Sequence, residues 1–527
     1  MPSHFILWPA LVYVGAALLI PRLRLWLGHP GRLLALLLSS VAAFVLALLV
    51  ARQAGGSQLV ISTWSDLGGL GRGIRFGLDP LGGSFLLLAG LVGVGAFVGS
   101  LDEREDAPSD DYQAGLLVLL GALTLLGLAG NMLTLLLVGL VLDAGLIFGI
   151  GLAGRPRWLL VTIVQSLVAQ ALLLAAALLL WRDTGNTDLA GASQQVALLV
   201  TGAAVARMAP LPFSLFPVAF EHLPQRVLAL LPLSTVGVGG LLLGRLAQAA
   251  DLSDVSLDGL AALAVLGIAL AGWVAWRREE LSVRLMMLGA IQAGWVLWAF
   301  AWGLPTLALT VAWSGVLALA ALAVHGGRLD MTSNAQLPGL LASLMLLGFP
   351  GSALWNAATV LSGEAWRRGD EWMLALATIG VMGTVAALFQ WLLPMRAEPP
   401  QRSRWVGVTL LALLSVPAVG ALFGLRLPAL PAESLEPAPL AARLAVLVVG
   451  WSGGFWLWRV HGLLQSLRPF LDAVGAIFSF VWLWRLVGRV GWLALSGLRG
   501  MMLVLEGENY GWLLLFIFLT MIFVLQS

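Results

Sequence analysis

The sequence predicts an all-α integral membrane protein with about 14 to 16 transmembrane helices. Of its 527 residues, 60% are hydrophobic and only 11% are charged. The mean hydropathy is +0.95, far above that of a water-soluble domain. The apolar residues are gathered in long runs separated by short polar segments, and each run is long enough, or nearly so, to cross a bilayer of roughly 30 Å.

These apolar runs divide the chain from one end to the other and leave no room for a soluble domain between them. They fall at about 4 to 20, 32 to 51, 83 to 101, 114 to 130, 132 to 153, 158 to 181, 195 to 219, 227 to 248, 259 to 276, 281 to 303, 304 to 324, 337 to 362, 372 to 395, 405 to 425, 440 to 458 and 508 to 526.

The short loops indicate how the chain is oriented. All 29 basic residues are arginines, and loops on the cytoplasmic side of a membrane are enriched in basic residues. Arginines cluster after the first, fifth, ninth and thirteenth runs, at Arg22, Arg24, Arg32, Arg155, Arg157, Arg277, Arg278, Arg396, Arg402 and Arg404. We expect these loops to be cytoplasmic, in a multi-pass protein of the bacterial cytoplasmic (inner) membrane.

Prolines interrupt two of the predicted helices. Pro210 and Pro212 break the seventh, and Pro350 breaks the twelfth. Broken helices inside a membrane need protein or water to satisfy their free backbone groups. The two breaks lie five helices apart, which is the pattern of inverted five-helix repeats around a transport route. The alternative is that two ordinary prolines coincide.

The predicted organisation follows from these breaks. The expected units are 1–113 (helices one to three), 114–248 and 249–396 (the two repeats), 397–459 (helices 14 and 15), 460–505 (a lateral amphipathic helix) and 506–527 (a terminal transmembrane anchor). The lateral helix is predicted because Arg468, Asp472, Ser479, Arg485, Arg489, Ser496 and Arg499 recur at helical spacing along one stripe. The alternative is two further crossing helices, one of them starting near Phe470.

Several classes of chemistry are excluded by composition. The chain has no cysteine and only five histidines, which are scattered without the spacing of metal ligands. It has no phosphate loop, nucleophile triad or dinucleotide fingerprint. Its arginines are spread over loops and form no basic patch for nucleic acid. We therefore expect no cofactor, no metal, no nucleic-acid partner and no catalytic residue in this chain.

One arginine stands apart from the loops. Arg207 lies in the apolar stretch GAAVARMAPLPF, about 18 Å into its helix at 1.5 Å per residue. An arginine at that depth requires an interior partner. Asp143 is the only acid inside the fourth to eighth helices and is the predicted partner. In the alternative, Asp143 is a tolerated polar residue bonded to Gln165 or Gln170.

A family resemblance rests on five motifs. FGLDPLGGSFLLL, with Asp79, resembles an Asp-x-Leu-Ser opening of the third helix. AGNMLTLLLVGL, with Asn131, resembles an Asn-Leu-Leu start of the fifth. ARMAPLPFSLFPVAFE is similar to the broken-helix motif Lys-Ser-Ala-Gln-x-Pro, with Pro212 on the proline and Arg207 on the lysine. EELSVRLMMLGAIQAGW and GFPGSALW are similar to an Asp-x-Lys segment ending in Gln-x-Gly and to Gly-x-Pro-x-x-Gly-Phe.

Together these motifs resemble the antiporter-like membrane subunits of respiratory complex I, membrane-bound hydrogenases, Mrp-type cation/proton antiporters and bicarbonate-uptake complexes. The resemblance covers at least residues 75 to 396 and implies the fold of that family, including a lateral helix in its largest members. It implies other membrane subunits as partners. It also implies ion-translocation candidates, which in this sequence are Asp143, Arg207, Glu221, Glu280 and Gln292.

The sequence departs from the family where protons are thought to move. The resemblance implies a midplane row of ionisable side chains, but apolar residues stand at those positions, at Leu140 or Val141, Leu231, Gly315 and Ala357. What remains is Asp143 and Arg207. A buried lysine releases its proton readily, whereas arginine side chains are not deprotonated in proteins. The pair is thus expected to be fixed, although protons passing through water and Asp143 remain an alternative.

The expected function is an antiporter-like membrane subunit of a complex I-related assembly that couples redox chemistry to ion movement. With most relay residues lost, its role in proton transfer is expected to be degenerate or structural. The alternatives are a scaffold subunit of another bioenergetic complex, or a subunit of a cation/proton antiporter or bicarbonate transporter. Whether the chain belongs to an enzyme, such as a quinone oxidoreductase, depends on its partners.

Overall fold

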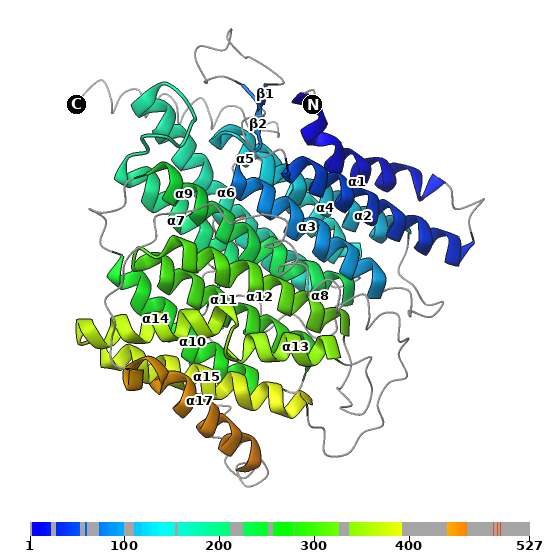
Figure 1. The fold of residues 1–527 in the computed structure, drawn as a ribbon. Coiled ribbons are helices and arrows are strands. Elements are labelled where there is room, and N and C mark those ends of the chain that lie inside the picture. The colour runs from blue at the N-terminus through cyan, green and yellow to red at the C-terminus, as the bar shows by residue number, and fades with distance from the viewer. Residues whose placement is uncertain are drawn as a thin grey trace. The chain divides into compact units, whose positions relative to one another are not determined.

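The structure is a computed structural model of the chain, in which the positions of most residues are described (Figure 1). The described residues are 3–22, 28–52, 58–60, 73–99, 110–152, 156–210, 225–250, 257–278, 280–325, 337–392, 440–460 and the single residues 489, 493 and 496.

The described chain is almost entirely helical. Its α-helices are α1 (Trp8–Leu19), α2 (His29–Ala51), α3 (Pro80–Gly99), α4 (Asp110–Leu128), α5 (Met132–Leu152), α6 (Pro156–Thr184), α7 (Gln194–Met208), α8 (Gln225–Pro232), α9 (Val238–Ala249), α10 (Asp258–Arg277), α11 (Leu281–Ala301), α12 (Pro305–His325), α13 (Leu337–Leu346), α14 (Ala353–Arg368), α15 (Glu371–Leu392) and α17 (Leu440–Val460). A short 3₁₀ helix, Ser3–Leu7, precedes α1.

The predicted all-α membrane fold is confirmed. Among the described residues, nine helices are long and apolar enough to cross a membrane, and shorter apolar helices accompany them. Fourteen of the predicted apolar runs correspond to described helices or to a helix with a break. The runs at 405 to 425 and 508 to 526 and nearly all of the predicted lateral helix, 460–505, lie outside the described residues.

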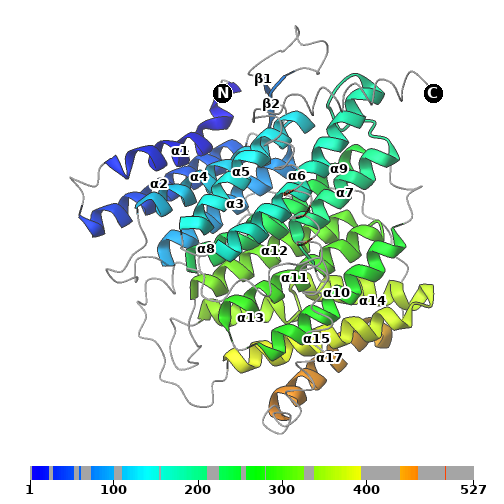
Figure 2. The same ribbon diagram turned by 180° about the vertical axis from the view of Figure 1, so that it is seen from behind.

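The helices pack side by side with their long axes roughly aligned, as the two opposite views show (Figures 1 and 2). α4 packs on α5 and α6 on α7, while α10 packs between α11 and α15. α12 lies against α8 and α13, and α17 covers α14 and α15. The largest fully buried side chains include Trp295 and Trp298 of α11, whose stacked rings lie 5.4 Å apart. The core is thus built from apolar helix faces and large aromatics.

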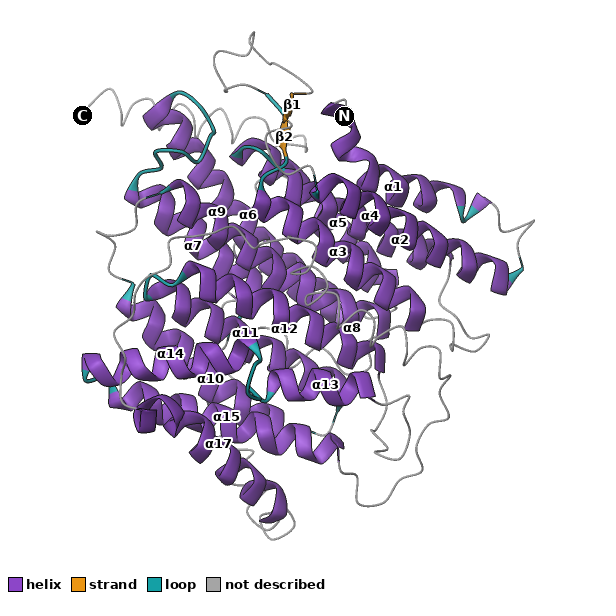
Figure 3. Ribbon diagram, in the orientation of Figure 1, coloured by secondary structure: helices purple, strands orange, loops and turns teal. Residues whose placement is uncertain are grey.

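A small sheet lies outside the helices, a feature that the sequence did not predict (Figure 3). β1 (Gln58–Val60) and β2 (Arg75–Gly77) are antiparallel, with Leu59 opposite Phe76. Phe76 also makes an isolated bridge to Ala129, just before α5. β2 therefore joins the end of α4 to the segment that leads into α3.

Two polar residues of the family-like motifs stabilise helix starts. Asp79 precedes α3, and its Oδ1 accepts a hydrogen bond of 2.7 Å from the backbone N–H of Gly82. Asn131 precedes α5, and its Oδ1 accepts one of 2.9 Å from the N–H of Thr134. Each side chain satisfies a backbone donor that a helix start leaves free. This capping explains why those residue types occur at those positions.

α7 ends at the first predicted break, and the second predicted break is present. α7 ends at Met208, and Ala209 adopts a left-handed conformation (φ 47°) directly before Pro210. The second break separates α13 from α14 at residues 347–352 and contains Pro350 between two glycines with positive φ. Pro212 lies outside the described residues.

At each of these two places, a side chain from a neighbouring helix donates a hydrogen bond to a backbone carbonyl oxygen. Gln165 of α6 donates from its Nε2 to the carbonyl oxygen of Ala206, at 2.7 Å, in the last turn of α7. Trp451 of α17 donates from its Nε1 to the carbonyl oxygen of Leu347, at 2.8 Å. Carbonyls freed inside a membrane have no bulk water to bind, so these donors stabilise the breaks.

A third irregularity lies between α8 and α9. Residues Leu233–Gly237 form a π-helical turn (η5), which makes α8, η5 and α9 one continuous but unevenly wound helix. The hydroxyls of Ser234 and Thr235 both donate to the carbonyl oxygen of Leu231, at 3.0 and 2.8 Å. Pro232 lacks a backbone donor, and the two hydroxyls bond to the carbonyl that precedes it.

Candidate functional site

The candidate site is formed by α5, α6 and α7, which follow one another in sequence. Asp143 is the twelfth of the 21 residues of α5, so it lies near the middle of that helix. Arg207 is the last residue but one of α7 and sits at the helix break. α6 packs against both α5 and α7.

Arg207 and Asp143 form a two-pronged ion pair, as the sequence predicted. Nη1 of Arg207 donates to Oδ1 of Asp143, and Nη2 donates to Oδ2 at 2.7 Å. Only 5% of the arginine side chain and 7% of the aspartate side chain are exposed. The planar guanidinium matches both carboxylate oxygens at once, which is the strongest geometry for such a pair.

The two glutamines of α6 that the sequence offered as alternative partners have separate tasks. Gln170 donates from its Nε2 to Oδ2 of Asp143, at 2.8 Å. Gln165 instead donates to the backbone of the α7 end, to Ala206 and more weakly to Arg207. Asp143 therefore binds both Arg207 and Gln170. Sequence spacing alone did not separate these two roles.

The arrangement holds a charged pair away from solvent without a surplus charge. Removing two ions from water is unfavourable, and their attraction offsets this only when the geometry is good and further hydrogen bonds are present. Both conditions are met here by the two-pronged contact and by the Gln170 amide. A guanidinium keeps its proton, so the contact itself does not switch by releasing one from Arg207.

The other buried arginines and the buried histidine in the described ranges lie near helix ends. Arg226, Arg245, Arg284 and His325 are each within five residues of an end of their helix. Nη2 of Arg245 donates to the carbonyl oxygen of Gly127 at 2.7 Å. Nη2 of Arg284 donates to Oε1 of Gln390 at 3.0 Å and to the carbonyl oxygen of Arg278. Hydropathy and residue spacing do not predict these contacts.

Apolar side chains occupy the positions where the resemblance implied a proton relay. Leu140 and Val141 are both 47% exposed on the outer surface of α5. Leu231, Gly315 and Ala357 are buried. The sequence has no ionisable group at any of these points, whereas Asp143, three residues after Leu140 on α5, is buried.

Gln292 fills the space beside Gly315. It lies in the middle of α11 and is 2% exposed. A Cβ atom placed on Gly315 would be 2.9 Å from Oε1 and 3.0 Å from Cγ of Gln292. The neutral amide therefore occupies the volume that a side chain at 315 would need.

The remaining candidates are Glu280 and Glu221. Glu280 is the half-buried residue that directly precedes α11, and its carbonyl oxygen accepts from the N–H of Arg284 at 3.0 Å. It is twelve residues from Gln292, or about 18 Å along the helix, so the two lie at different depths. Glu221 lies outside the described residues.

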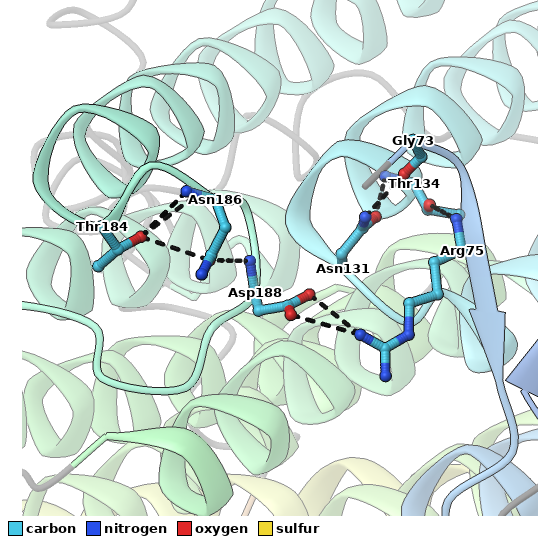
Figure 4. A network of polar contacts seen from close by, with 7 residues as sticks. All are labelled: Gly73, Arg75, Asn131, Thr134, Thr184, Asn186 and Asp188. Carbon is cyan, nitrogen blue, oxygen red and sulfur yellow. Dashed lines mark hydrogen bonds and ion pairs between the residues drawn. The ribbon is translucent and has the colours of Figure 1, made fainter. Parts of the chain in front are cut away.

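A second polar cluster lies at the start of α5 (Figure 4). Nη1 of Arg75 contacts both oxygens of Asp188 at 3.3 and 3.4 Å, and the backbone N–H of Arg75 donates to Oγ1 of Thr134 at 2.8 Å. Nδ2 of Asn131 donates to the carbonyl oxygen of Gly73 at 2.8 Å. This cluster ties β2 and the loop between α6 and α7 to the start of α5.

Among the described residues, no group of three or more histidine, aspartate or glutamate side chains is placed so that it could hold a metal ion. No family model matches the sequence. No curated protein matches the sequence either.

Solved structures do share the fold. A chain in the structure of the Mrp complex from Dietzia sp. DQ12-45-1b superposes with a TM-score of 0.78 at 19% sequence identity, over 99% of this chain and 63% of that one. This chain thus spans less than two thirds of the Mrp chain. A chain of the membrane-bound sulfane sulfur reductase, an archaeal respiratory membrane complex, superposes with a TM-score of 0.72 at 15% identity, over 98% of this chain and 99% of that one.

These likenesses confirm the fold that the sequence motifs predicted. They extend over nearly the whole chain, beyond the 75 to 396 covered by the motifs. At such low identity they establish the fold and leave the function to be argued from the site. The chain has the fold of the superposed chains of the Mrp complex and of the membrane-bound sulfane sulfur reductase.

Proposed function

We propose that this chain is an antiporter-like subunit of a complex I-related membrane assembly that couples redox chemistry to ion movement. In this proposal the chain itself binds no cofactor and carries out no redox step. Its partners are other membrane subunits, and its membrane is the bacterial cytoplasmic membrane. The two five-helix repeats, 114–248 and 249–396, remain part of the proposal, as does the lateral helix over 460–505.

The length of the structural match supports a place in a respiratory assembly. The chain and the sulfane sulfur reductase chain cover 98% and 99% of each other. No large domain is therefore left unmatched on either side. The match to the Mrp chain leaves about a third of that chain without a counterpart here, since only 63% of it is covered.

The observation that carries the functional part of the proposal is the Asp143–Arg207 pair. It is a buried ion pair that joins the middle of α5 to the last turn of α7. A relay needs groups that gain and lose protons, whereas a guanidinium remains charged. We therefore infer that the pair holds the helices together electrostatically and that proton transfer through this chain is degenerate.

The experiment for membership is purification of the tagged protein from its own membranes in a gentle detergent, followed by mass spectrometry of what accompanies it. The proposal predicts iron–sulfur, quinone-binding or hydrogenase-like subunits in stoichiometric amounts. Recovery of the chain alone, or with soluble proteins that have no redox group, would refute the redox placement.

A second candidate is a subunit of a cation/proton antiporter without redox partners. The specific observation in its favour is the likeness to the Mrp complex, which has the higher TM-score and the higher identity of the two. The same purification separates the two proposals. Accompanying subunits that are all membrane proteins without redox groups would favour the antiporter.

A further inference from the structure

We propose that one face of the protein binds a transmembrane helix of a neighbouring subunit, and that this helix presents a neutral hydrogen-bonding side chain to Asn356. We call this surface the break face. It consists of the exposed residues at the α13–α14 break, Phe349, Pro350, Gly351 and Asn356, and of the exposed stripe Val448, Ser452 and Phe455 on α17. The inference rests on the proposed function, because it needs a multisubunit membrane complex. It adds which face the partner covers and by what chemistry.

The break lies deep in the membrane. α14 ends at Arg368, and the next residue, Gly369, turns the chain with a left-handed conformation (φ 75°). Arg368 is partly exposed and paired with Glu364, as expected of a helix end at the membrane surface. Asn356 precedes Arg368 by twelve residues, which is about 18 Å along α14. In a hydrocarbon core of roughly 30 Å, Asn356 and the break before it therefore lie near the middle.

The outer side of the break is open. Phe349 is 50% exposed, and Pro350 and Gly351 beside it are exposed too. Irregular backbone does not occur against lipid in the hydrocarbon region, and it is tolerated only where protein covers it or where it lines a water-filled cavity. These residues lie on the outer surface, so they require a cover that the described residues do not provide.

The side chain of Asn356 requires the same cover. It lies in the first turn of α14, it is exposed, and its amide forms no hydrogen bond among the described residues. Contact with hydrocarbon is unfavourable for an amide, because nothing there replaces the hydrogen bonds that water gives. In membranes, asparagine side chains bond to other helices across a helix–helix interface. Asn356 therefore indicates protein, rather than lipid, on this face.

The middle of α17 lies beside the break. Phe349 stacks on Trp451 of α17 with ring centroids 6.3 Å apart. Trp355, in the first turn of α14, packs on the same ring at 6.1 Å. The break, the start of α14 and the middle of α17 thus lie side by side at one depth.

The exposed stripe of α17 extends the break face with mainly apolar residues. Val448, Ser452 and Phe455 follow one another at intervals of four and three residues, so they share one side of the helix. The hydroxyl of Ser452 donates to the carbonyl oxygen of Val448 at 2.8 Å, which leaves it no unmet donor. Another side of α17 packs on α15. The stripe is therefore free to receive the apolar residues of a partner helix.

The outward faces of the other helices differ from the break face. Away from the first and last turns, the exposed residues of the other described transmembrane helices are apolar, as at Phe148 of α5 and Leu167 of α6. Lipid chains solvate such faces without leaving a polar group unpaired. Among the described helices, the need for a protein cover at mid-depth is thus confined to the break face.

Depth and chemistry together select the occupant. A soluble protein does not reach the middle of the bilayer, and lipid chains carry no hydrogen-bonding group there. The break face has no ionisable residue, so a charged partner side chain would be left uncompensated. Serine, threonine, asparagine or glutamine on a partner helix satisfies the amide of Asn356. Apolar residues of the same helix cover Phe349 and Phe455.

The test places photoreactive benzoylphenylalanine at Phe349 or at Phe455 of the full chain in its native membranes. Phe148 is the matched control, because it is also an exposed phenylalanine, at 64%, on the apolar outer face of α5. After irradiation, the adducts are separated by electrophoresis and identified by mass spectrometry. The inference predicts that both break-face probes crosslink to one and the same membrane subunit, with a yield several times that from Phe148 to that subunit.

Asn356→Leu tests the chemistry of the contact. Leucine is similar in size and suits lipid, but it leaves the partner's hydrogen-bonding side chain unpaired. The crosslink from Phe455 to the partner should therefore fall about three- to tenfold, while the amount of this chain in the membrane does not fall. Asn356→Gln is the control, because it keeps the amide, and it should retain most of the crosslink.

Several results would overturn the inference. They are adducts with lipid alone from both probes, adducts only within this chain, an equal yield of the same subunit from Phe148, and full crosslinking in Asn356→Leu. If purification recovers redox subunits while both probes mark only lipid, the break face is wrong and the proposed function stands. Recovery of the chain alone would overturn both. If replacement of Phe349 lowers the amount of protein, the probe at Phe455 decides the question.

Discussion

Nη2 of Arg207 lies 2.7 Å from Oδ2 of Asp143, and the same oxygen receives the amide of Gln170 at 2.8 Å. One carboxylate thus binds two neighbouring helices, α6 and α7, from its place on α5. Neither charge has another buried ionic partner among the described residues. The stability of this part of the membrane domain depends on keeping both charges or removing both.

We expect Arg207→Ala to lower the amount of assembled protein in the membrane. Removing one partner of a buried pair leaves an uncompensated charge, which costs about 3 to 5 kcal/mol. The double variant Asp143→Asn with Arg207→Gln should be markedly more abundant than the single variant, because it leaves neutral groups. The measurement is the amount of each protein in membranes, together with its thermal unfolding in detergent. Equal abundance of the single and double variants would contradict the pairing.

Gln165→Leu should weaken the end of α7. The change keeps the volume but removes the donor to the carbonyl of Ala206, at an expected cost of about 1 to 3 kcal/mol for an unsatisfied buried group. Amide hydrogen exchange in the last turn of α7 should become faster. The control is Gln195→Leu, in the first turn of α7, where the native side chain is exposed. The same effect from both variants would argue against a capping role.

Trp451→Phe tests the second break in the same way. A smaller aromatic ring remains, but the donor to the carbonyl of Leu347 is lost, so the melting temperature should fall by an amount that matches at least about 1 to 3 kcal/mol. Trp456→Phe is the matched control, since Trp456 is 60% exposed on the same helix. If both variants have the melting temperature of the native protein, the carbonyl of Leu347 does not need this donor.

In the cluster of Figure 4, we expect the Asn131 cap to contribute more to the free energy of unfolding than the Arg75–Asp188 ion pair. Asn131→Ala removes a buried N-cap and should cost about 1 to 2 kcal/mol. Arg75→Ala breaks a pair whose side chains are 19% and 27% exposed, and should cost less than about 1 kcal/mol. Chemical unfolding of both variants measures the two losses of stability. A larger loss in Arg75→Ala than in Asn131→Ala would contradict the prediction.

Gly315→Ala should be destabilising by about 1 to 3 kcal/mol, because the added carbon meets the Gln292 side chain. Combining it with Gln292→Ala opens the space and should make the alanine at 315 close to neutral. The coupling between the two changes is read from a double-mutant cycle of unfolding temperatures. Additive effects would mean that the Gln292 side chain moves aside without a loss of stability.

Much of the fold was predictable because hydropathy and helix length are directly linked in a membrane. The predicted run at 281 to 303 corresponds to α11, Leu281–Ala301, and the prolines placed both breaks within a few residues. The Asp143–Arg207 pair was predictable for a similar reason. An isolated charge in an apolar run requires a partner, and few were available.

Other features depended on contacts that no local pattern encodes. The sequence offered Gln165 and Gln170 as equal partners of Asp143, and only the packing of α6 between α5 and α7 separated them. The β1–β2 pairing joins two three-residue segments between α2 and α3, which are too short to give a strand pattern in the sequence. Buried arginines such as Arg245 bind backbone carbonyls across the core, and hydropathy does not reveal such partners.

The most direct test of the central claim is proton movement by the assembly that carries the Asp143→Asn and Arg207→Gln double variant. Sealed vesicles containing the purified complex are driven by its electron donor, and proton uptake is followed with a pH-sensitive dye against the native complex. If the pair is a fixed structural contact, the double variant assembles and moves protons at the native ratio per electron. An assembled double variant with a lower ratio would show that protons pass through Asp143, and would contradict the account.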